Sequence, residues 1–151
     1  MRPIEILLVE DNPGDVRLTR EAMTESRIAN NLNVVGDGAA ALDFLERKGE
    51  YANAPVPDLV LLDLNLPKVS GHDVLESIKR NEALKTIPVV ALTTSHARAD
   101  IEQCYKNHVN CYITKPMSYG PFMDVVRSIE DFWLTRVELP RAERKEWDIG
   151  M

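Results

Sequence analysis

The sequence is poor in the features that define several classes of protein. It has only two cysteines, Cys104 and Cys111, which are too few for a disulfide framework and lack metal-site spacing. No apolar run approaches the roughly 18 residues that a membrane-spanning helix needs. The formal net charge is −6 and no basic run stands out, so binding to nucleic acid by charge has little support. Without a signal-peptide pattern at the start, we expect a cytoplasmic protein with neither a membrane nor nucleic acid as partner.

The sequence repeats one pattern five times, a short apolar strand followed by an amphipathic helix. Predicted strands lie at residues 4–9, 32–35, 59–63, 88–92 and 111–114. Predicted helices begin at residue 13, span 39–47, 71–80 and 98–107, and run from 119 to at least 134. Because the strands are apolar on both faces, they indicate a parallel sheet covered on both sides. We therefore expect an α/β fold with a doubly wound, five-stranded parallel sheet of the flavodoxin-like type and an extended last helix.

Polar side chains lie at the ends of four of the predicted strands, namely Glu10 with Asp11, then Asp63, Thr93 and Lys115. The carboxyl ends of parallel strands meet at one edge of the sheet, so these groups should converge there. An isolated aspartate after a strand is ordinarily a turn residue or a helix cap. Three carboxylates together instead repel one another unless a cation joins them, and oxygen ligands suit Mg²⁺ better than zinc. With that cation Asp63 would stay ionised and could act as a nucleophile that forms an aspartyl phosphate.

These motifs resemble the receiver domains of bacterial two-component response regulators. The segment LLVEDNPGD is similar to the family's first strand and acidic pair, and VLLDLNLPKVSG to its phosphoacceptor strand and turn. PVVALTTS and YITKP are similar to the ends of its fourth and fifth strands. The resemblance implies a receiver domain at residues 1–137, followed by a charged tail at 138–151.

The resemblance also implies a role for each matching residue at the acidic end of the site. Asp63 would be the phosphoacceptor. Glu10, Asp11 and Asp63 would hold Mg²⁺ together with the backbone carbonyl of Asn65. Asn65 and Ser95 occupy positions that, in the family, tune the lifetime of the acyl phosphate.

The remaining matched residues would sense the phosphoryl group. Thr93 would bond to it and shift on activation, and Tyr112 would rotate as Thr93 moves. Lys115 would pair with the phosphoryl group, and its peptide bond to Pro116 is expected to be cis, which is plausible only before proline.

A closer resemblance concerns the partner. The segments RKGEYANAPVPDLVLLDLNLPKVSG and IEDFWLTRVELP are similar to the small response regulators that serve phytochrome-type histidine kinases. This implies a histidine kinase as phosphodonor, with a light-sensing bacteriophytochrome as the candidate. The stretch after Leu134 is too short for a further domain, so we expect output by contact with another protein or by onward transfer of phosphate.

The last predicted helix carries more apolar side chains than one buried face needs, among them Phe122, Val125, Phe132 and Trp133. One reading is a broad core face with a single exposed aromatic residue. The other is a contact surface, since contiguous exposed apolar patches mark interfaces. We expect a homodimer through the fourth helix, the fifth strand and the fifth helix, as is frequent in the family.

These residues are consistent with three alternative functions. The first is a phosphoacceptor switch that is not an enzyme on external substrates and performs only self-directed phosphotransfer and autodephosphorylation. The second is a phosphatase with an aspartyl-phosphate intermediate, but such enzymes commonly need a second acid two residues after the nucleophile, where Asn65 stands. The third is a pseudo-receiver with lost chemistry, which would lack the acceptor, a metal ligand or the lysine. The complete set of residues favours the switch.

Overall fold

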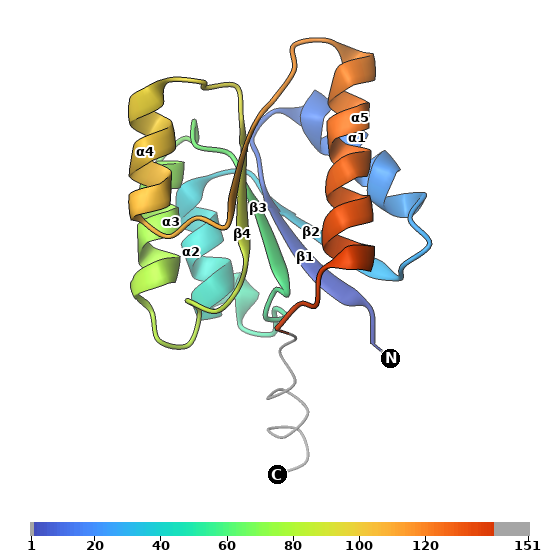
Figure 1. Ribbon diagram of the computed structural model, residues 1–151. Helices are drawn as coiled ribbons and strands as arrows, with labels where there is room; N and C mark the ends of the chain where they lie inside the picture. Colours follow the sequence, from blue (N-terminus) through green and yellow to red (C-terminus); the bar gives the residue numbers. More distant parts are fainter. Residues whose placement is uncertain (1, 141–151) are drawn as a thin grey trace.

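The computed structural model describes residues 2–140, in which five strands alternate with five α-helices (Figure 1). The strands are β1 (Ile4–Val9), β2 (Asn30–Val35), β3 (Leu59–Leu62), β4 (Val89–Thr93) and β5 (Cys111–Thr114). The helices are α1 (Pro13–Thr24), α2 (Gly38–Glu46), α3 (Gly71–Arg80), α4 (Arg98–Lys106) and α5 (Tyr119–Ile129). The five predicted strand–helix units are therefore confirmed. Most of the predicted tail, with Trp147, lies outside the described residues.

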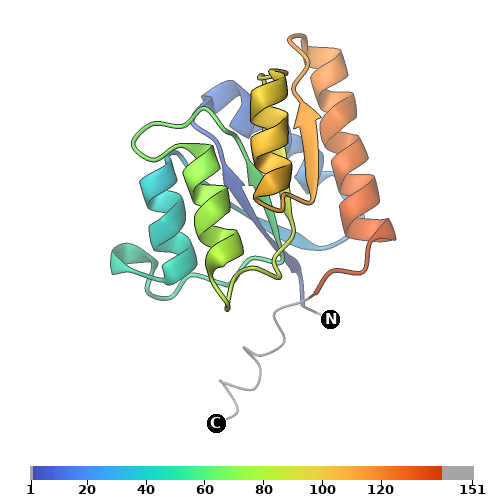
Figure 2. The same cartoon turned by 60° about the vertical axis from the view of Figure 1, so that its left-hand side comes forward.

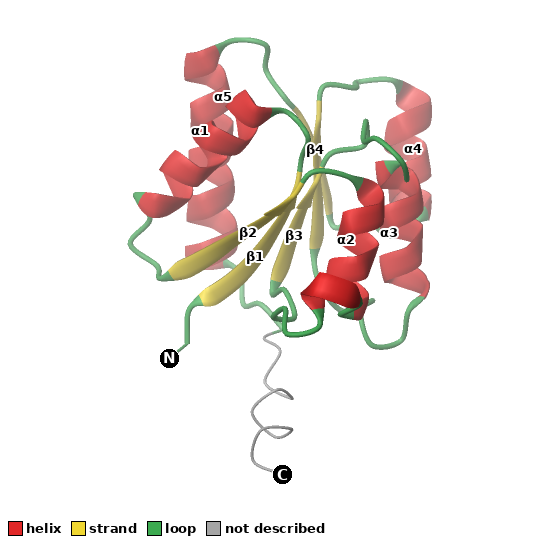
Figure 3. Cartoon of the chain, turned by 180° about the vertical axis from the view of Figure 1, so that it is seen from behind, coloured by secondary structure: helices red, strands yellow, loops and turns green. Residues whose placement is uncertain are grey.

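The strands form one sheet in the order β2-β1-β3-β4-β5, and every neighbouring pair is parallel. Helices α1 and α5 cover one face, and α2, α3 and α4 cover the other (Figures 1 and 3). After β1 the chain first adds β2 on one side and then β3 on the other, so the strand order reverses beside β1. The doubly wound parallel fold is thereby confirmed, and its carboxyl edge at this reversal is where such folds bind ligands.

Two apolar cores lie on the two faces of the sheet. All four residues of β3 are 0% exposed, which explains why the run LVLL contains no polar residue. Leu62 and Val74 belong to the core under α2, α3 and α4. Leu61 and Val126 belong to the core under α1 and α5. None of the helices within residues 2–140 is long and apolar enough to cross a membrane.

Local sequence sets the ends of the helices that border the carboxyl edge. The Asn12 side chain accepts a hydrogen bond from the Asp15 backbone N–H at 3.1 Å, and Pro13 occupies the first helical turn of α1. Gly71 begins α3 at a point of close approach, because a Cβ there would lie 2.2 Å from the backbone oxygen of Asp63. The glycine thus lets α3 pack directly against the end of β3.

The last helix differs from its predicted form. The α-helical part ends at Ile129 and continues as a π-helical segment, Glu130–Arg136. The Val137 backbone N–H donates to the Phe132 carbonyl at 3.0 Å, which is the wider hydrogen-bond spacing of a π-helix. The predicted extension to at least Leu134 is confirmed, while the change of helix type was not anticipated.

Candidate functional site

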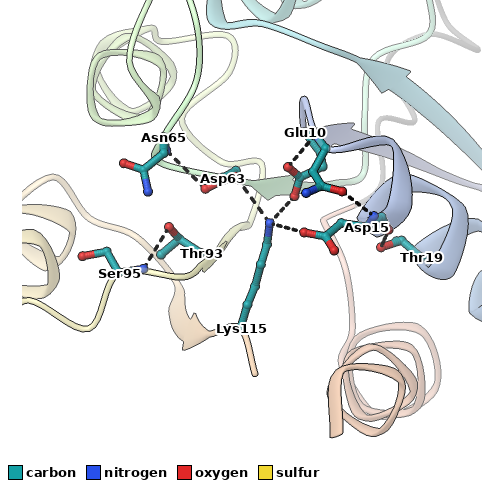
Figure 4. Close-up of polar contacts among 9 residues, drawn as sticks. Glu10, Asp15, Thr19, Asp63, Asn65, Thr93, Ser95 and Lys115 are labelled. Atoms are coloured by element: carbon teal, nitrogen blue, oxygen red, sulfur yellow. Dashed lines mark hydrogen bonds and ion pairs between the residues drawn. The ribbon is translucent and has the colours of Figure 1, made fainter. Parts of the chain in front are cut away.

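The ends of β1, β3, β4 and β5 bring the predicted residues to one place at the carboxyl edge (Figure 4). Glu10, Asp11 and Asp63 each offer a carboxylate oxygen, and these oxygens lie within 4.8 Å of one another. Asp63 and Glu10 are 7% and 4% exposed, whereas Asp11 is exposed at the mouth of the site. Lys115 reaches in from the end of β5 and is itself 4% exposed. The convergence expected from the parallel sheet is present.

Lys115 is the centre of the polar contacts (Figure 4). Its Nζ donates to Asp63 Oδ2 at 3.3 Å, to Asp15 Oδ2 at 2.9 Å, and to Glu10 Oε1. Asp15 was missed by the sequence reasoning, which considered only the ends of strands. It sits in the first turn of α1, where the Asn12 cap fixes its backbone. The signal that could have found it is the short segment DNPGD, which places a second acid four residues after Asp11, in the first turn of the helix that follows β1.

Burial and charge act against each other in this cluster. Burial raises the pKa of Glu10 to about 7, aided by the nearby charge of Asp63 and opposed by the contact with Lys115. Burial would lower the pKa of Lys115, but the hydrogen bond and attraction from Glu10, with Asp63 and Asp15, raise it above its usual value. Lys115 is therefore a firmly held cation facing several acids. This surplus of oxygen ligands fits a hard divalent cation.

One backbone N–H on the loop after β3 orients the Asp63 carboxylate. The Asn65 N–H donates to Asp63 Oδ1 at 3.2 Å, while Asp63 Oδ2 faces Lys115. The two oxygens of Asp63 therefore have different partners. Asn65 is exposed beside this carboxylate at the mouth of the site.

The two predicted switch residues meet at Ser95, which follows β4. The Ser95 N–H donates to Thr93 Oγ at 3.4 Å, and the Tyr112 hydroxyl donates to the Ser95 carbonyl at 2.7 Å. Thr93 is 0% exposed, and Tyr112 packs against the core under α2, α3 and α4. Thr93 and Tyr112 are thus linked through one residue of the β4–α4 loop.

The expected cis bond between Lys115 and Pro116 is wrong, because no peptide bond within residues 2–140 is cis. A trans bond is intrinsically favoured by about 0.5–1 kcal/mol even before proline. The Lys115 backbone N–H donates to the Thr93 carbonyl at 2.6 Å, which continues the pairing of β4 with β5 by one residue. Sheet pairing therefore places Lys115 in the site with a trans bond.

The expected contact surface on the last helix is only partly exposed. Phe122 is 4% exposed within the core under α1 and α5, so its assignment to a dimer surface is wrong. It shares the inward stripe with Val126, four residues on. Phe132 is 54% exposed. The edge strand β5 lies beside α5 (Figure 2). A groove of about 370 Å³ beside Phe132 is lined by Cys111, Ile113, Asp124, Val125, Ser128, Ile129, Phe132 and Trp133.

Comparisons with known proteins agree with this geometry. Residues 6–127 match the response regulator receiver domain family. The response regulator Rcp1 of Synechocystis sp. is 51% identical over 140 residues, which is 93% of this chain and 95% of Rcp1.

The solved structures that resemble this chain also include response regulators. The Mn²⁺-bound form of Rcp1 superposes with a TM-score of 0.91 at 50% identity, covering 92% of this chain and all of that one. The phosphorylated cyanobacterial phytochrome response regulator RcpA gives 0.90 at 48% identity, covering 93% and 100% of the two chains. The bacteriophytochrome response regulator AtBRR gives 0.71 at 40% identity, with the same coverage.

Proposed function

Because the chain belongs to the response regulator receiver domain family, we propose that it accepts a phosphoryl group from a histidine kinase on Asp63. The position of that carboxylate carries the proposal. It ends the fully buried strand β3, lies beside Glu10 and Asp11, and has Oδ2 3.3 Å from Lys115 Nζ. An ionised aspartate with a cation at hand has the properties of a nucleophile whose product is a dianion.

The transfer is a displacement at phosphorus. A carboxylate oxygen of Asp63 attacks the phosphohistidine of the kinase, a new P–O bond forms, and the P–N bond breaks. The electron pair of that bond stays on the imidazole nitrogen. Lys115 would pair with a phosphoryl oxygen, and Thr93 would donate its hydroxyl hydrogen, since its oxygen already accepts from the Ser95 N–H.

The carboxylates of Glu10, Asp11 and Asp63 fit a divalent cation, and we assign Mg²⁺, with the Asn65 backbone carbonyl as a further ligand. When bound, the cation would neutralise negative charge that builds up during transfer. The Mn²⁺ found in the Rcp1 structure is a hard cation of the same kind. Lys115 donates to two of these carboxylates, Glu10 and Asp63.

The partner we propose is a histidine kinase of the phytochrome class. The similarity to RcpA and AtBRR, which are named for phytochromes, supports this assignment. The receiver would extend over residues 1–137 and act in the cytoplasm. Because the net charge is −6 and the sequence has no run of Lys and Arg, we propose that the output is contact with protein rather than with nucleic acid.

The groove between β5 and α5 supports a homodimer through α4, β5 and α5. Val125, Phe132 and Trp133 line it, and Phe132 remains largely exposed in the single chain. Burying an aromatic side chain of this kind is the main source of affinity in many interfaces.

The two competing functions have less support. A pseudo-receiver would lack one of the groups that converge here, namely Glu10, Asp11, Asp63, Thr93 and Lys115. A phosphatase acting on external substrates would need an acid at the position of Asn65, whose backbone instead orients Asp63. We therefore propose a signalling switch.

The experiment that tests the proposal is intact-mass measurement after incubation with acetyl phosphate and Mg²⁺. Wild type should gain one phosphoryl group, which should be absent without the cation and absent in Asp63→Asn. Asp73→Asn, an exposed acid on α3, is the matched control and should gain it normally. If folded wild type gains nothing from acetyl phosphate or from a phosphorylated phytochrome-class kinase, the proposed function is wrong.

A further inference from the structure

A second group of polar side chains lies beside the site, on the side of α3 and α4. Asp100, in the first turn of α4, accepts a hydrogen bond from the Ser95 hydroxyl through Oδ2. Its other oxygen, Oδ1, lies 2.9 Å from His72 Nε2, which projects from α3. One carboxylate therefore joins the β4–α4 loop to a neighbouring helix. We call Ser95, Asp100 and His72 the Asp100 latch.

The latch also forms the beginning of α4. The residue at the N-cap position, Ala97, has no side chain that could cap the helix. Ser95 Oγ accepts the Ala97 N–H at 3.3 Å while donating to Asp100. A carboxylate in the first helical turn is further favoured by the helix dipole. Ser95 and Asp100 together therefore hold the loop against the start of α4.

The same loop residue contacts the phosphorylation site. The Ser95 backbone donates to Thr93 Oγ and accepts from the Tyr112 hydroxyl. Its side chain and backbone are thus held from different directions, by Asp100 on one side and by the two switch residues on the other. In this arrangement the Thr93 oxygen already has a donor, which leaves its own hydrogen for a phosphoryl oxygen.

The charge on Asp100 strengthens the latch. Hydrogen bonds from Ser95 and then His72 lower the pKa of Asp100 below its usual value, so the carboxylate is ionised at neutral pH. Hydrogen bonds to an ionised group are stronger than neutral ones. The remaining ring nitrogen of His72, Nδ1, lies 3.8 Å from Cys104 Sγ on α4. Burial raises the pKa of that thiol to about 11, so it stays neutral and leaves Asp100 as the charged partner of His72.

We propose that Asp100, held by His72, is a positioning residue that fixes Ser95 and thereby preorganises Thr93 and Tyr112 to receive the phosphoryl group. This role rests on the proposed function. Without the latch, the β4–α4 loop would have to be ordered at the moment when Thr93 binds the phosphoryl oxygen. That ordering lowers the affinity for the phosphoryl group without altering the carboxylates that hold the cation.

The test uses Asp100→Asn, which keeps the size of the side chain and removes its charge, and the pair His72→Ala and His72→Gln. Asp73→Asn is the matched control, because Asp73 is an exposed acid in the first turn of α3. The measured quantities are the Kd for beryllofluoride, which mimics a phosphoryl group, at saturating Mg²⁺, and the Kd for Mg²⁺ alone.

Asp100→Asn and His72→Ala should weaken beryllofluoride binding by about two- to fivefold, as expected for one partly exposed charged hydrogen bond. His72→Gln, which keeps a donor near the position of Nε2, should restore most of the affinity. The Kd for Mg²⁺ should be unchanged in all variants. A variant that had lost its structure would bind Mg²⁺ more weakly, so this measurement excludes unfolding as the cause. In protein without any phosphoryl mimic, a ¹³C titration of the Asp100 carboxyl should show a higher pKa in Ser95→Ala than in wild type.

The outcomes separate this inference from the function on which it rests. If Asp100→Asn binds beryllofluoride as tightly as wild type, or more tightly, the positioning role of Asp100 is wrong, while the proposed phosphoacceptor function still stands. An unchanged Asp100 titration in Ser95→Ala also overturns the latch. If wild type binds no beryllofluoride and takes no phosphoryl group from any donor, the proposed function fails and the latch fails with it.

Discussion

Replacing Lys115 with methionine removes the positive charge that several carboxylates share while keeping most of the side-chain volume. Lys115 Nζ lies 2.9 Å from Asp15 Oδ2 and 3.3 Å from Asp63 Oδ2, and it also bonds to Glu10. Removing one partner of a buried ion pair costs about 3–5 kcal/mol. Asp15 has a side chain that is 24% exposed, and Glu10 can take up a proton, so we expect the lower end of that range.

At pH 8 without divalent cation, Lys115→Met should therefore lose about 3 kcal/mol of unfolding free energy. For a domain of this size, that loss lowers the thermal midpoint by about 6–12 °C. Saturating Mg²⁺ should remove most of the difference, because a cation among the carboxylates offsets the same repulsion.

The assay is thermal unfolding followed by circular dichroism, with and without Mg²⁺. Lys85→Met is the control, since Lys85 pairs with Glu82 at the surface and its side chain is 46% exposed. Surface pairs of this kind contribute little, so its midpoint should stay close to that of wild type. A Lys115→Met protein as stable as wild type without cation, or a gap that Mg²⁺ leaves unchanged, would refute the reasoning.

Three further predictions concern the cation, the strand end and the groove. Burial raises the pKa of Glu10 from 4.5 to about 7, so without cation the free energy of unfolding should fall as the pH rises between these values. Because Mg²⁺ binds the ionised carboxylate, the rise in thermal midpoint that it causes should be larger at pH 8 than at pH 5.5. An equal rise at both pH values would contradict this. Gly71→Ala places a Cβ 2.2 Å from the Asp63 backbone oxygen. It should lower the free energy of unfolding, measured in urea, by about 2 kcal/mol or more, and it should also slow phosphorylation. Gly120→Ala, where the added Cβ meets nothing within 4 Å, is the control and should have neither effect. Phe132→Ser should weaken self-association in sedimentation velocity with little change in thermal midpoint, and an unchanged association constant would remove Phe132 from the interface.

The parts of the fold that the sequence could predict are those with uninterrupted local signals. The boundaries of β1, β5 and α3 match the prediction, because apolar runs, helix-capping residues and turn residues mark them on both sides. The site followed from one rule of topology, since the residues after parallel strands share an edge. That rule predicted the meeting of Asp63 with Lys115, which are 52 residues apart.

The remaining features depend on packing that the sequence pattern does not encode. Asp15 joins the site from a helix, so a rule about strand ends could not find it. Phe122 and Phe132 both looked like surface candidates, and only the packing of α5 and of the π-helical segment after it buries Phe122 and exposes Phe132. The sequence pattern predicted a helix to at least Leu134 but carried no signal for the change to a π-helical segment at residues 130–136.

The order of the strands along the chain also determines when the complete site can form during synthesis. Lys115 and Glu10 are 105 residues apart, and the lysine follows the last strand of the sheet. A nascent chain that has emerged only as far as β4 already carries the acidic residues but not the lysine. Such a chain would depend on a divalent cation alone to neutralise these acids. On the proposed function, a chain without β5 would lack the positive charge that Lys115 places beside Asp63, so the complete site can form only when β5 joins the sheet.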